Sequence, residues 1–275
     1  MKVFQYTHKN GNDFQKRGKN IMARITLEFF SEVLTKHTTI TVVLPEKSAL
    51  KSKDLPTLYL LHGFSDDHTM WTRQTGIERY ATDKGLAVVM PDVDHSFYTD
   101  MTYGKNYWTF LTEELPEIVR SLLPLSDKRE DNFVAGLSMG GYGAFKWLLN
   151  KPEDFAAGAS LSGVLELAKH NQEHGGENPM DEVVFNSFGG NKLTGTMHDI
   201  FHLAKQVDQS DGPKPKLYHA CGTEDFLFDQ NKHFKELTDE LSLEVKTIFD
   251  PGAHEWNYWD HHIKKVIDWL PIESN

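Results

Sequence analysis

One serine in this chain lies in a sequence context that can turn its hydroxyl into a nucleophile. The apolar run from Asn132 to Gly136 is long enough for a short buried strand, and it continues into Gly136-Leu137-Ser138-Met139-Gly140. Small residues follow, which favour the start of a closely packed helix. A tight strand-to-helix turn of this kind presents the serine hydroxyl at the end of a sheet, facing the positive end of the helix dipole. Attack by Ser138 also needs a base, an orienting acid and donors for the oxyanion.

The acid and the base are expected on loops that follow two later strands. A strand over Lys216–Ala220 runs into a loop that ends in Glu224-Asp225, and a strand over Glu244–Phe249 runs into a loop with His254. Because the carboxyl ends of parallel strands meet at one edge of a sheet, these loops should lie near Ser138. The predicted catalytic residues are therefore Ser138 as nucleophile, Asp225 as orienting acid and His254 as base.

Other residues compete for these roles. Asp229 and Asp250 are alternative acids, although Asp229 is expected to cap the following helix and Asp250 shares a loop with His254. His219 is an alternative base. His261 and His262 are adjacent in a predicted helix, so we expect their side chains to point in different directions and not to form one site.

The oxyanion hole is predicted to use two backbone N–H groups. One belongs to Met139, which follows the nucleophile, and the other to Phe64, in the loop after the third strand. Gly63 permits a sharp bend directly before Phe64. The residues predicted to line the substrate pocket are His62, Gly63 and Trp108.

Eight strands alternating with helices are needed to position these groups, and the sequence predicts both. The first two strands alternate apolar and polar residues and indicate an antiparallel pair at a sheet edge, whereas the others are short apolar runs typical of buried parallel strands. Pro116 is expected to bend the second helix or to end its first half. The expected strands are Arg24–Phe30, Thr38–Leu44, Thr57–Leu61, Leu86–Met90, Asn132–Gly136, Gly158–Ser162, Lys216–Ala220 and Glu244–Phe249, and the expected helices are Ile77–Lys84, Thr109–Leu123, Gly140–Asn150, Asp229–Leu241 and Glu255–Leu270.

This alternation predicts one doubly wound α/β domain over residues 22–275. Residues 164–212 interrupt this alternation of strands and helices with weak helical segments over Met180–Phe188 and His198–Val207. We expect residues 164–212 to form a lid-like insertion. Residues 1–21 are polar and basic, and they are expected to be a disordered leader or a tag.

Composition narrows the class of partner. A net charge of −11 argues against nucleic acid and against an anionic membrane surface. Cys221 is the sole cysteine of the 275 residues and no apolar run reaches the roughly 18 residues of a membrane span, so a cytoplasmic protein is expected. His198 and His202 have a zinc-like spacing without an evident third ligand, so neither a metal nor an organic cofactor is expected.

Several stretches together resemble a known branch of the α/β hydrolases. They include Leu60-Leu61-His62-Gly63-Phe64, the run from Tyr107 to Pro116, the Ser138 turn, Gly222-Thr223-Glu224-Asp225 and Gly252-Ala253-His254-Glu255-Trp256. The chain resembles the esterase D / S-formylglutathione hydrolase-like branch, and within it the tributyrin esterases of lactic acid bacteria and streptococci. The resemblance spans nearly everything after residue 21.

The resemblance implies an α/β-hydrolase fold, with an eight-stranded, mostly parallel sheet and helices on both faces. It implies a serine carboxylesterase that hydrolyses short-chain acyl esters, acetyl to butyryl, including acylated sugars or aromatic acid esters, through an acyl-enzyme intermediate. The partner is then a small-molecule ester, and the resemblance also suggests a homo-oligomer. A thioesterase acting on S-formylglutathione, an acyltransferase to a sugar or lipid alcohol, and a non-catalytic interaction module are the alternatives.

Overall fold

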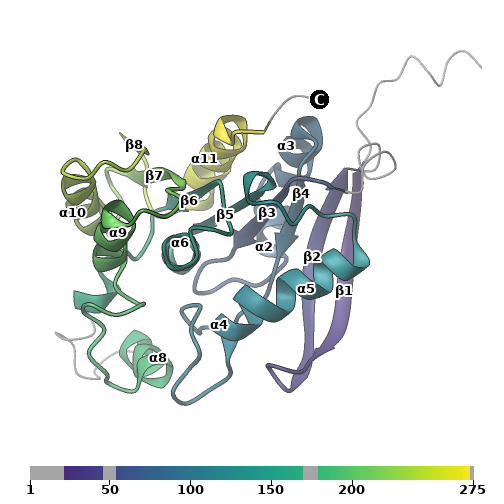
Figure 1. Cartoon of the computed structure of the whole chain (residues 1–275), viewed down its shortest axis with the longest axis horizontal. Coiled ribbons are helices and arrows are strands. Elements are labelled where there is room, and N and C mark those ends of the chain that lie inside the picture. The colour runs from purple at the N-terminus through teal and green to yellow at the C-terminus, as the bar shows by residue number, and fades with distance from the viewer. Residues whose placement is uncertain (1–21, 46–53, 170–178, 273–275) are drawn as a thin grey trace, which may run out of the picture.

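The computed structural model describes residues 22–45, 54–169 and 179–272 (Figure 1). The predicted leader, residues 1–21, and residues 170–178 of the predicted lid-like insertion lie outside the described residues. Within the described ranges, no helix combines the length and apolar character that crossing a membrane requires.

A single eight-stranded sheet forms the centre of the molecule, in the order β1-β2-β4-β3-β5-β6-β7-β8. β2 pairs antiparallel with β1 and β4, and the remaining neighbours pair in parallel. All eight predicted strands are present, with ends shifted by at most two residues. The strands are β1 (Met22–Ser31), β2 (Lys36–Pro45), β3 (Thr57–Leu61), β4 (Ala87–Met90), β5 (Asn132–Leu137), β6 (Ala157–Leu161), β7 (Lys216–Gly222) and β8 (Val245–Asp250).

The burial of the strands follows their hydrophobic patterns. Every residue of β3, β4, β5 and β6 is buried, as their continuous apolar runs predict for strands covered on both faces. β1, at the edge, alternates instead, and its Ile25, Leu27 and Phe29 pack against the core from one face.

Helices cover both faces of the sheet (Figure 1). On one face, α2, α3 and α11 bury Trp71, Ile77 and Ile263 against the sheet, and on the other, α5, α6 and α10 bury Leu115, Phe145 and Phe234. The helices are α2 (Met70–Gln74), α3 (Ile77–Lys84), α4 (Tyr107–Thr109), α5 (Leu115–Leu122), α6 (Met139–Asn150), α8 (Pro179–Phe188), α9 (Ile200–Gln209), α10 (Phe228–Thr238) and α11 (Trp256–Trp269).

The helix predicted over Thr109–Leu123 has a π-helical middle. α4 and α5 are joined by a wider π turn over Phe110–Glu114, and Pro116 stands in the first turn of α5. A proline has no N–H to donate to the carbonyl four residues earlier, so the regular ladder cannot pass through Pro116. A local change of helix type relieves this conflict.

The insertion after β6 contains a helix that belongs to the core. α9 begins after Asp199, whose carboxylate accepts hydrogen bonds from the N–H groups of Phe201 and His202. Its apolar stripe, which includes Ile200, Leu203 and Val207, is buried in the core on the same face as α6. This part of the insertion is therefore held by packing.

Candidate active site

Ser138 occupies a turn of unusual backbone conformation between β5 and α6. Its φ and ψ are 54° and −117°, a region that residues with a side chain rarely adopt. Neighbouring backbone holds the turn in place, because the Ser138 N–H donates to the Leu161 carbonyl at 2.9 Å and the Ser138 carbonyl accepts from Tyr142 N–H at 3.1 Å. The hydroxyl is thus presented at the carboxyl end of the central strand.

The glycine two residues after Ser138 is required by a close approach of two backbones. A Cβ atom at Gly140 would lie 2.4 Å from the Leu61 carbonyl oxygen and 2.5 Å from the His62 carbonyl oxygen. Both atoms belong to the end of β3 and the loop that follows it. The start of α6 is therefore seated directly on the backbone that leads to Phe64.

His254 and Asp225 reach Ser138 from the loops after β8 and β7. His254 Nε2 lies 3.0 Å from Ser138 Oγ. On the other side of the ring, His254 Nδ1 lies 2.9 Å and 3.1 Å from the two carboxylate oxygens of Asp225. With Nδ1–H donating to the carboxylate, Nε2 is free to accept the proton of the serine hydroxyl.

The surroundings of Asp225 keep its carboxyl ionised. The side chain is fully buried, and burial by itself opposes ionisation. Hydrogen bonds from His254 and from the Leu227 N–H at 2.8 Å more than offset that effect and hold the pKa of Asp225 below its usual value. His254 remains 17% exposed, so the base is open to the site while its orienting partner is not.

The rival acids and bases have other environments. Asp250 is hydrogen-bonded to His262 at 3.1 Å, and His219 is buried and hydrogen-bonded to Asn231 at 2.8 Å. Asp229 lies in the first turn of α10, whose N-cap is Leu227, so the expected capping role of Asp229 is wrong.

The two predicted oxyanion donors lie at the ends of neighbouring elements. Met139 is the first residue of α6, so no helix carbonyl is available to its N–H. The Phe64 N–H follows Gly63, where a Cβ would meet Leu137 Cδ1 at 2.6 Å and Asp66 Oδ2 at 2.8 Å. A larger residue at position 63 would therefore displace the side chains of Leu137 and Asp66.

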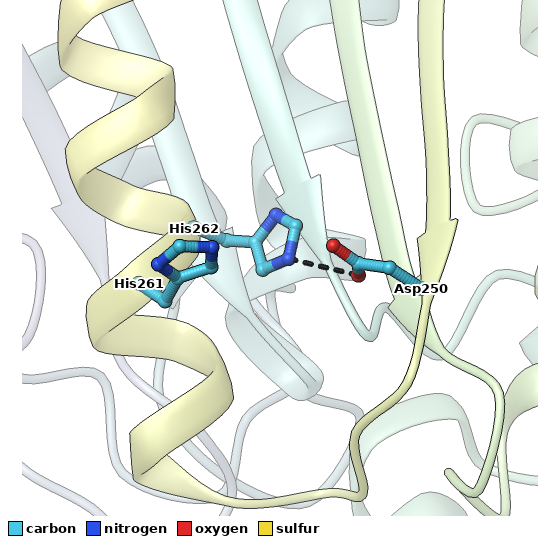
Figure 2. Close-up of side chains that lie close together, drawn as sticks. All are labelled: Asp250, His261 and His262. Carbon is cyan, nitrogen blue, oxygen red and sulfur yellow. Dashed lines mark hydrogen bonds and ion pairs between the residues drawn. The ribbon is translucent and has the colours of Figure 1, made fainter.

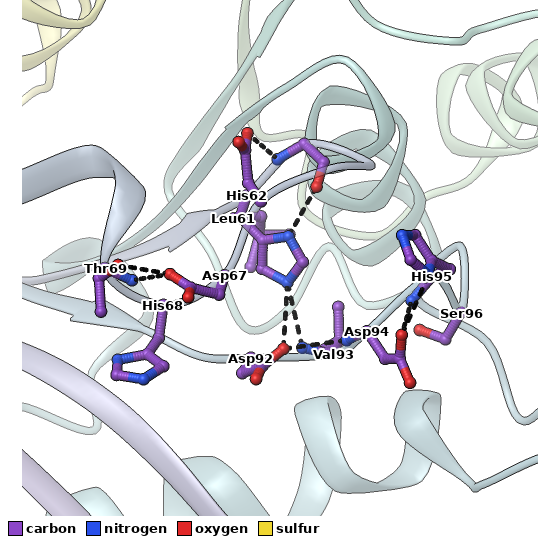
Figure 3. A network of polar contacts seen from close by, with 12 residues as sticks. Leu61, His62, Asp67, His68, Thr69, Asp92, Val93, Asp94, His95 and Ser96 are labelled. Atoms are coloured by element: carbon purple, nitrogen blue, oxygen red, sulfur yellow. Dashed lines mark hydrogen bonds and ion pairs between the residues drawn. The ribbon is translucent and has the colours of Figure 1, made fainter. Parts of the chain in front are cut away.

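His62 holds this loop from beneath (Figure 3). Its Nδ1–H donates to the Gly63 carbonyl at 2.7 Å, and its Nε2 accepts from the Val93 N–H at 3.1 Å. The Tyr98 hydroxyl donates to the His62 carbonyl at 2.8 Å. Burial lowers the pKa of His62, which favours the neutral ring that this pattern requires.

The prediction that the His62 side chain lines the substrate pocket is wrong. The side chain is 1% exposed and both ring nitrogens bind backbone groups, so it supports the loop and is not available to a substrate. Trp108 is half-buried, and the ammonium of the buried Lys146 lies 4.7 Å from the centre of its ring. The Phe64 ring packs against His95, with ring centres 4.3 Å apart.

Two aromatic residues beside the base do not follow from the sequence pattern. Phe226, next to Asp225, is 77% exposed, and its ring centre lies 4.5 Å from that of His254. Trp259 packs edge-on to His254 at 4.9 Å, and its Nε1 donates to Ser162 Oγ. An aromatic residue directly after the predicted acid is the one sequence signal that could have drawn attention to Phe226.

A group of side chains outside the catalytic residues could hold a metal ion, and it corrects the expectation for His261 and His262. Among the residues that the structure describes, the metal-capable group of three or more is Asp250, His261 and His262, with ligand atoms all within 4.8 Å of one another. The prediction that the adjacent His261 and His262 cannot share a site is therefore wrong. Their Cα atoms diverge around the helix, but the imidazole rings are long enough to converge, with centres 5.3 Å apart.

Known proteins resemble the chain over most of its length. The model of the Esterase family, described as "Putative esterase", matches residues 31–269. An acetyl esterase of Caldicellulosiruptor saccharolyticus is 33% identical over 270 residues, which cover 92% of this chain and 100% of that protein.

Two solved structures from Staphylococcus aureus are also similar. A fluorophosphonate-binding serine hydrolase F, with substrate bound, is 37% identical at a TM-score of 0.83 and covers 92% of this chain and 99% of its own. An S-formylglutathione hydrolase is 38% identical at a TM-score of 0.81 and covers 91% of this chain and 99% of its own.

Proposed function

Because the chain belongs to the Esterase family and is a carboxylic ester hydrolase, we propose that Ser138, His254 and Asp225 carry out ester hydrolysis through an acyl-enzyme. The observation that carries this proposal is the continuous hydrogen-bonded chain from Ser138 Oγ through the His254 ring to the buried Asp225 carboxylate. The likeness to the two S. aureus structures confirms the predicted α/β-hydrolase fold.

The proposed first half-reaction transfers the acyl group to the enzyme. Ser138 Oγ attacks the ester carbonyl carbon while His254 Nε2 takes the hydroxyl proton. Negative charge gathers on the carbonyl oxygen, where the N–H groups of Phe64 and Met139 would stabilise it. The tetrahedral intermediate collapses, the C–O bond to the alcohol breaks, and His254 returns the proton to the departing alkoxide.

Water completes the reaction by the same route. His254 Nε2 takes a proton from water as the hydroxide attacks the acyl carbon, and the proton then passes to Ser138 Oγ as the acid leaves. Throughout, Asp225 holds the imidazole orientation and stabilises the imidazolium. One ester and one water are consumed, one alcohol and one carboxylic acid are released, and Ser138 and His254 return to their starting protonation states.

The proposed substrates are small-molecule esters with short acyl groups, from acetyl to butyryl, as in the tributyrin esterases that the sequence resembles. Phe64 and Trp108 are the proposed apolar walls of the acyl pocket, whereas the fully buried Met139 contributes its N–H. A small pocket separates acyl groups by only about 1–3 kcal/mol per methylene, so a graded preference is expected. The cytoplasmic location and the homo-oligomer stay predictions.

A thioesterase of the S-formylglutathione hydrolase type is the second candidate. It is favoured by the 38% identical solved structure of that description, and it would use the same three residues. A thioester places sulfur where the ester has oxygen, and the leaving thiolate needs less help from His254 as an acid.

Turnover of p-nitrophenyl esters from acetate to palmitate, beside S-formylglutathione, tests both candidates. We expect activity to peak at the short acyl chains and to vanish in Ser138→Ala. A much higher kcat/KM for S-formylglutathione than for any oxygen ester would favour the thioesterase. Activity that persists in Ser138→Ala would refute the assignment of the nucleophile.

A further inference from the structure

A second cluster of chemically capable side chains joins the end of β8 to α11 (Figure 2). Asp250 is the last residue of β8, and His261 and His262 lie in the second turn of α11. One ligand atom from each of the three lies within 4.8 Å of the others. None of these residues takes part in the hydrogen-bonded chain of Ser138.

We propose that Asp250, His261 and His262 form a binding site for a divalent transition-metal ion, with Zn²⁺ as the ion that fits best. Two imidazole nitrogens and one carboxylate oxygen are a donor set that Zn²⁺ accepts, with water as the fourth ligand. Mg²⁺ and Ca²⁺ prefer sets made of oxygen alone, so two imidazoles argue against them.

The distance between two of the ligands already suits a metal. His262 Nε2 lies 3.1 Å from Asp250 Oδ1. Zn–N and Zn–O bonds of about 2.0–2.2 Å at a tetrahedral angle put neighbouring ligand atoms roughly 3.3 Å apart. An ion can therefore replace the hydrogen-bonded proton between these two atoms with almost no movement of either side chain.

The fold fixes His262 for this role. Its side chain is fully buried and stacks on the Tyr258 ring, with ring centres 4.2 Å apart and planes inclined by 29°. Its Nδ1 is buried without a hydrogen-bond partner among the described residues. When Nε2 turns its lone pair to the metal, the ring proton moves to Nδ1, so the neutral histidine needs no net proton exchange.

His261 closes the site from the solvent side. It is exposed, and its ring stands at 89° to that of His262. The three ligand atoms lie within 4.8 Å of one another, so the distances to His261 must shrink by at most roughly 1.5 Å for coordination, which an exposed side chain can achieve by rotation about its own bonds.

Two features limit the affinity. Lys265 Nζ lies 3.5 Å from Asp250 Oδ2, so an ammonium group competes with the metal for this carboxylate. The unpartnered Nδ1 of His262 also lacks the supporting acceptor that metal-bound histidines usually have, a deficit worth about 10- to 100-fold in affinity. The site is thus suited to reversible binding and not to a permanently held ion.

A bound ion would tie together the two ends of the segment that carries His254. Residues 251–260 lie between the ligand at the end of β8 and the ligands in α11, and His254 is among them. Binding to the native state alone raises the stability of that state by mass action. The expected consequence is resistance to heat, without a requirement for the ion in catalysis.

Zinc binding by the untagged full chain tests the proposal, after dialysis against a chelator. Isothermal titration with Zn²⁺ should give one ion per chain, and the melting temperature should rise with added Zn²⁺. His261→Gln, which removes an exposed ligand and leaves the Asp250–His262 hydrogen bond intact, should weaken binding at least about tenfold and reduce the thermal shift at a given Zn²⁺ concentration.

His233→Gln is the matched control. It removes another exposed imidazole that contacts a carboxylate, Glu166, at 3.0 Å, and it should bind Zn²⁺ within twofold of the unchanged chain. The proposal is overturned if the chain binds no Zn²⁺, if His261→Gln binds as well as the parent, or if His233→Gln weakens binding equally. Ester hydrolysis by each variant reports separately on the proposed function, since Ser138, His254 and Asp225 are unchanged.

Discussion

In most places a glycine substitution destabilises a protein more than an alanine substitution, and the backbone strain at Ser138 predicts the opposite order there. Ser138→Ala and Ser138→Gly both remove the hydroxyl, so both lose the 3.0 Å hydrogen bond to His254. They differ in that alanine keeps a Cβ atom at φ 54° and ψ −117°, whereas glycine does not. We expect Ser138→Gly to be the more stable of the two.

The size of the effect follows from two opposing contributions. A residue with a side chain held in a sparsely populated backbone region costs about 1–3 kcal/mol, and glycine relieves this cost. Glycine in turn loses about 0.5–1 kcal/mol relative to alanine because its unfolded state is more flexible. The difference favours glycine by roughly 1 kcal/mol, or about 2–4 °C in melting temperature for a domain of this size.

Urea unfolding and thermal melting of the two variants measure this difference. The matched control is Ser160, which lies fully buried in the regular strand β6 beside the turn. There the usual order should hold, and Ser160→Gly should be less stable than Ser160→Ala. If Ser138→Ala proves as stable as Ser138→Gly, or more so, the argument that the turn stores strain is refuted.

Three further predictions concern the orienting acid Asp225, the aromatic ring of Phe226 beside the base, and the stability of the protein at low pH. Asp225→Asn should lower kcat for a p-nitrophenyl ester by about 10⁴-fold, which is less than the roughly 10⁶-fold loss expected for His254→Ala. The loss is smaller because an amide at position 225 misorients the His254 ring without removing it. Near-full activity of Asp225→Asn would exclude Asp225 as the orienting acid. Phe226→Ala should lower kcat/KM for aryl acetates by about 3- to 10-fold and for methyl acetate hardly at all. We expect this because the exposed ring packs on His254, the residue proposed to protonate the departing alcohol, and is therefore expected to contact an aryl alcohol part. An equal loss on both esters would argue for damage to the base, and Phe30→Ala, at another exposed aromatic, is the control. Burial lowers the pKa of His219 to about 4 and also lowers that of His62, whereas both titrate near 6.5 in the unfolded chain. Below pH 6.5 the unfolded state therefore binds more protons, and the free energy of unfolding should fall from pH 6.5 towards 4 by up to about 1.4 kcal/mol per histidine and pH unit. Urea unfolding that gives the same free energy at pH 7 and pH 5 would contradict this.

Local patterns were sufficient to predict the sheet and the loops that bear the site. The buried strands are apolar runs bounded by polar residues, and the order of the loops places Asp225 and His254 at the same sheet edge as Ser138. α2 has only five residues, too few for a helical period to be recognised. The π turn before Pro116 depends on how a helix resolves a local conflict, which composition does not specify.

The sequence was less informative about what a side chain does once it is buried. His62 stands in a motif next to the oxyanion loop, and that position is equally compatible with contact to substrate or with support of the loop. The tertiary placement of Val93 decides between them, since its N–H binds the ring from a distant part of the chain. The convergence of His261 and His262 depends likewise on side-chain torsions and on Asp250.

The contact between Gly140 and the backbone after β3 has a consequence for how such a site can change over time. The spacing between the serine and the loop that ends in Phe64 is set by main-chain atoms, with no side chain interposed. Residues around the pocket can then be exchanged without altering that spacing. Substrate preference and chemical competence become separable traits, and selection or design can vary the first through Trp108 or Phe226 while leaving the second untouched.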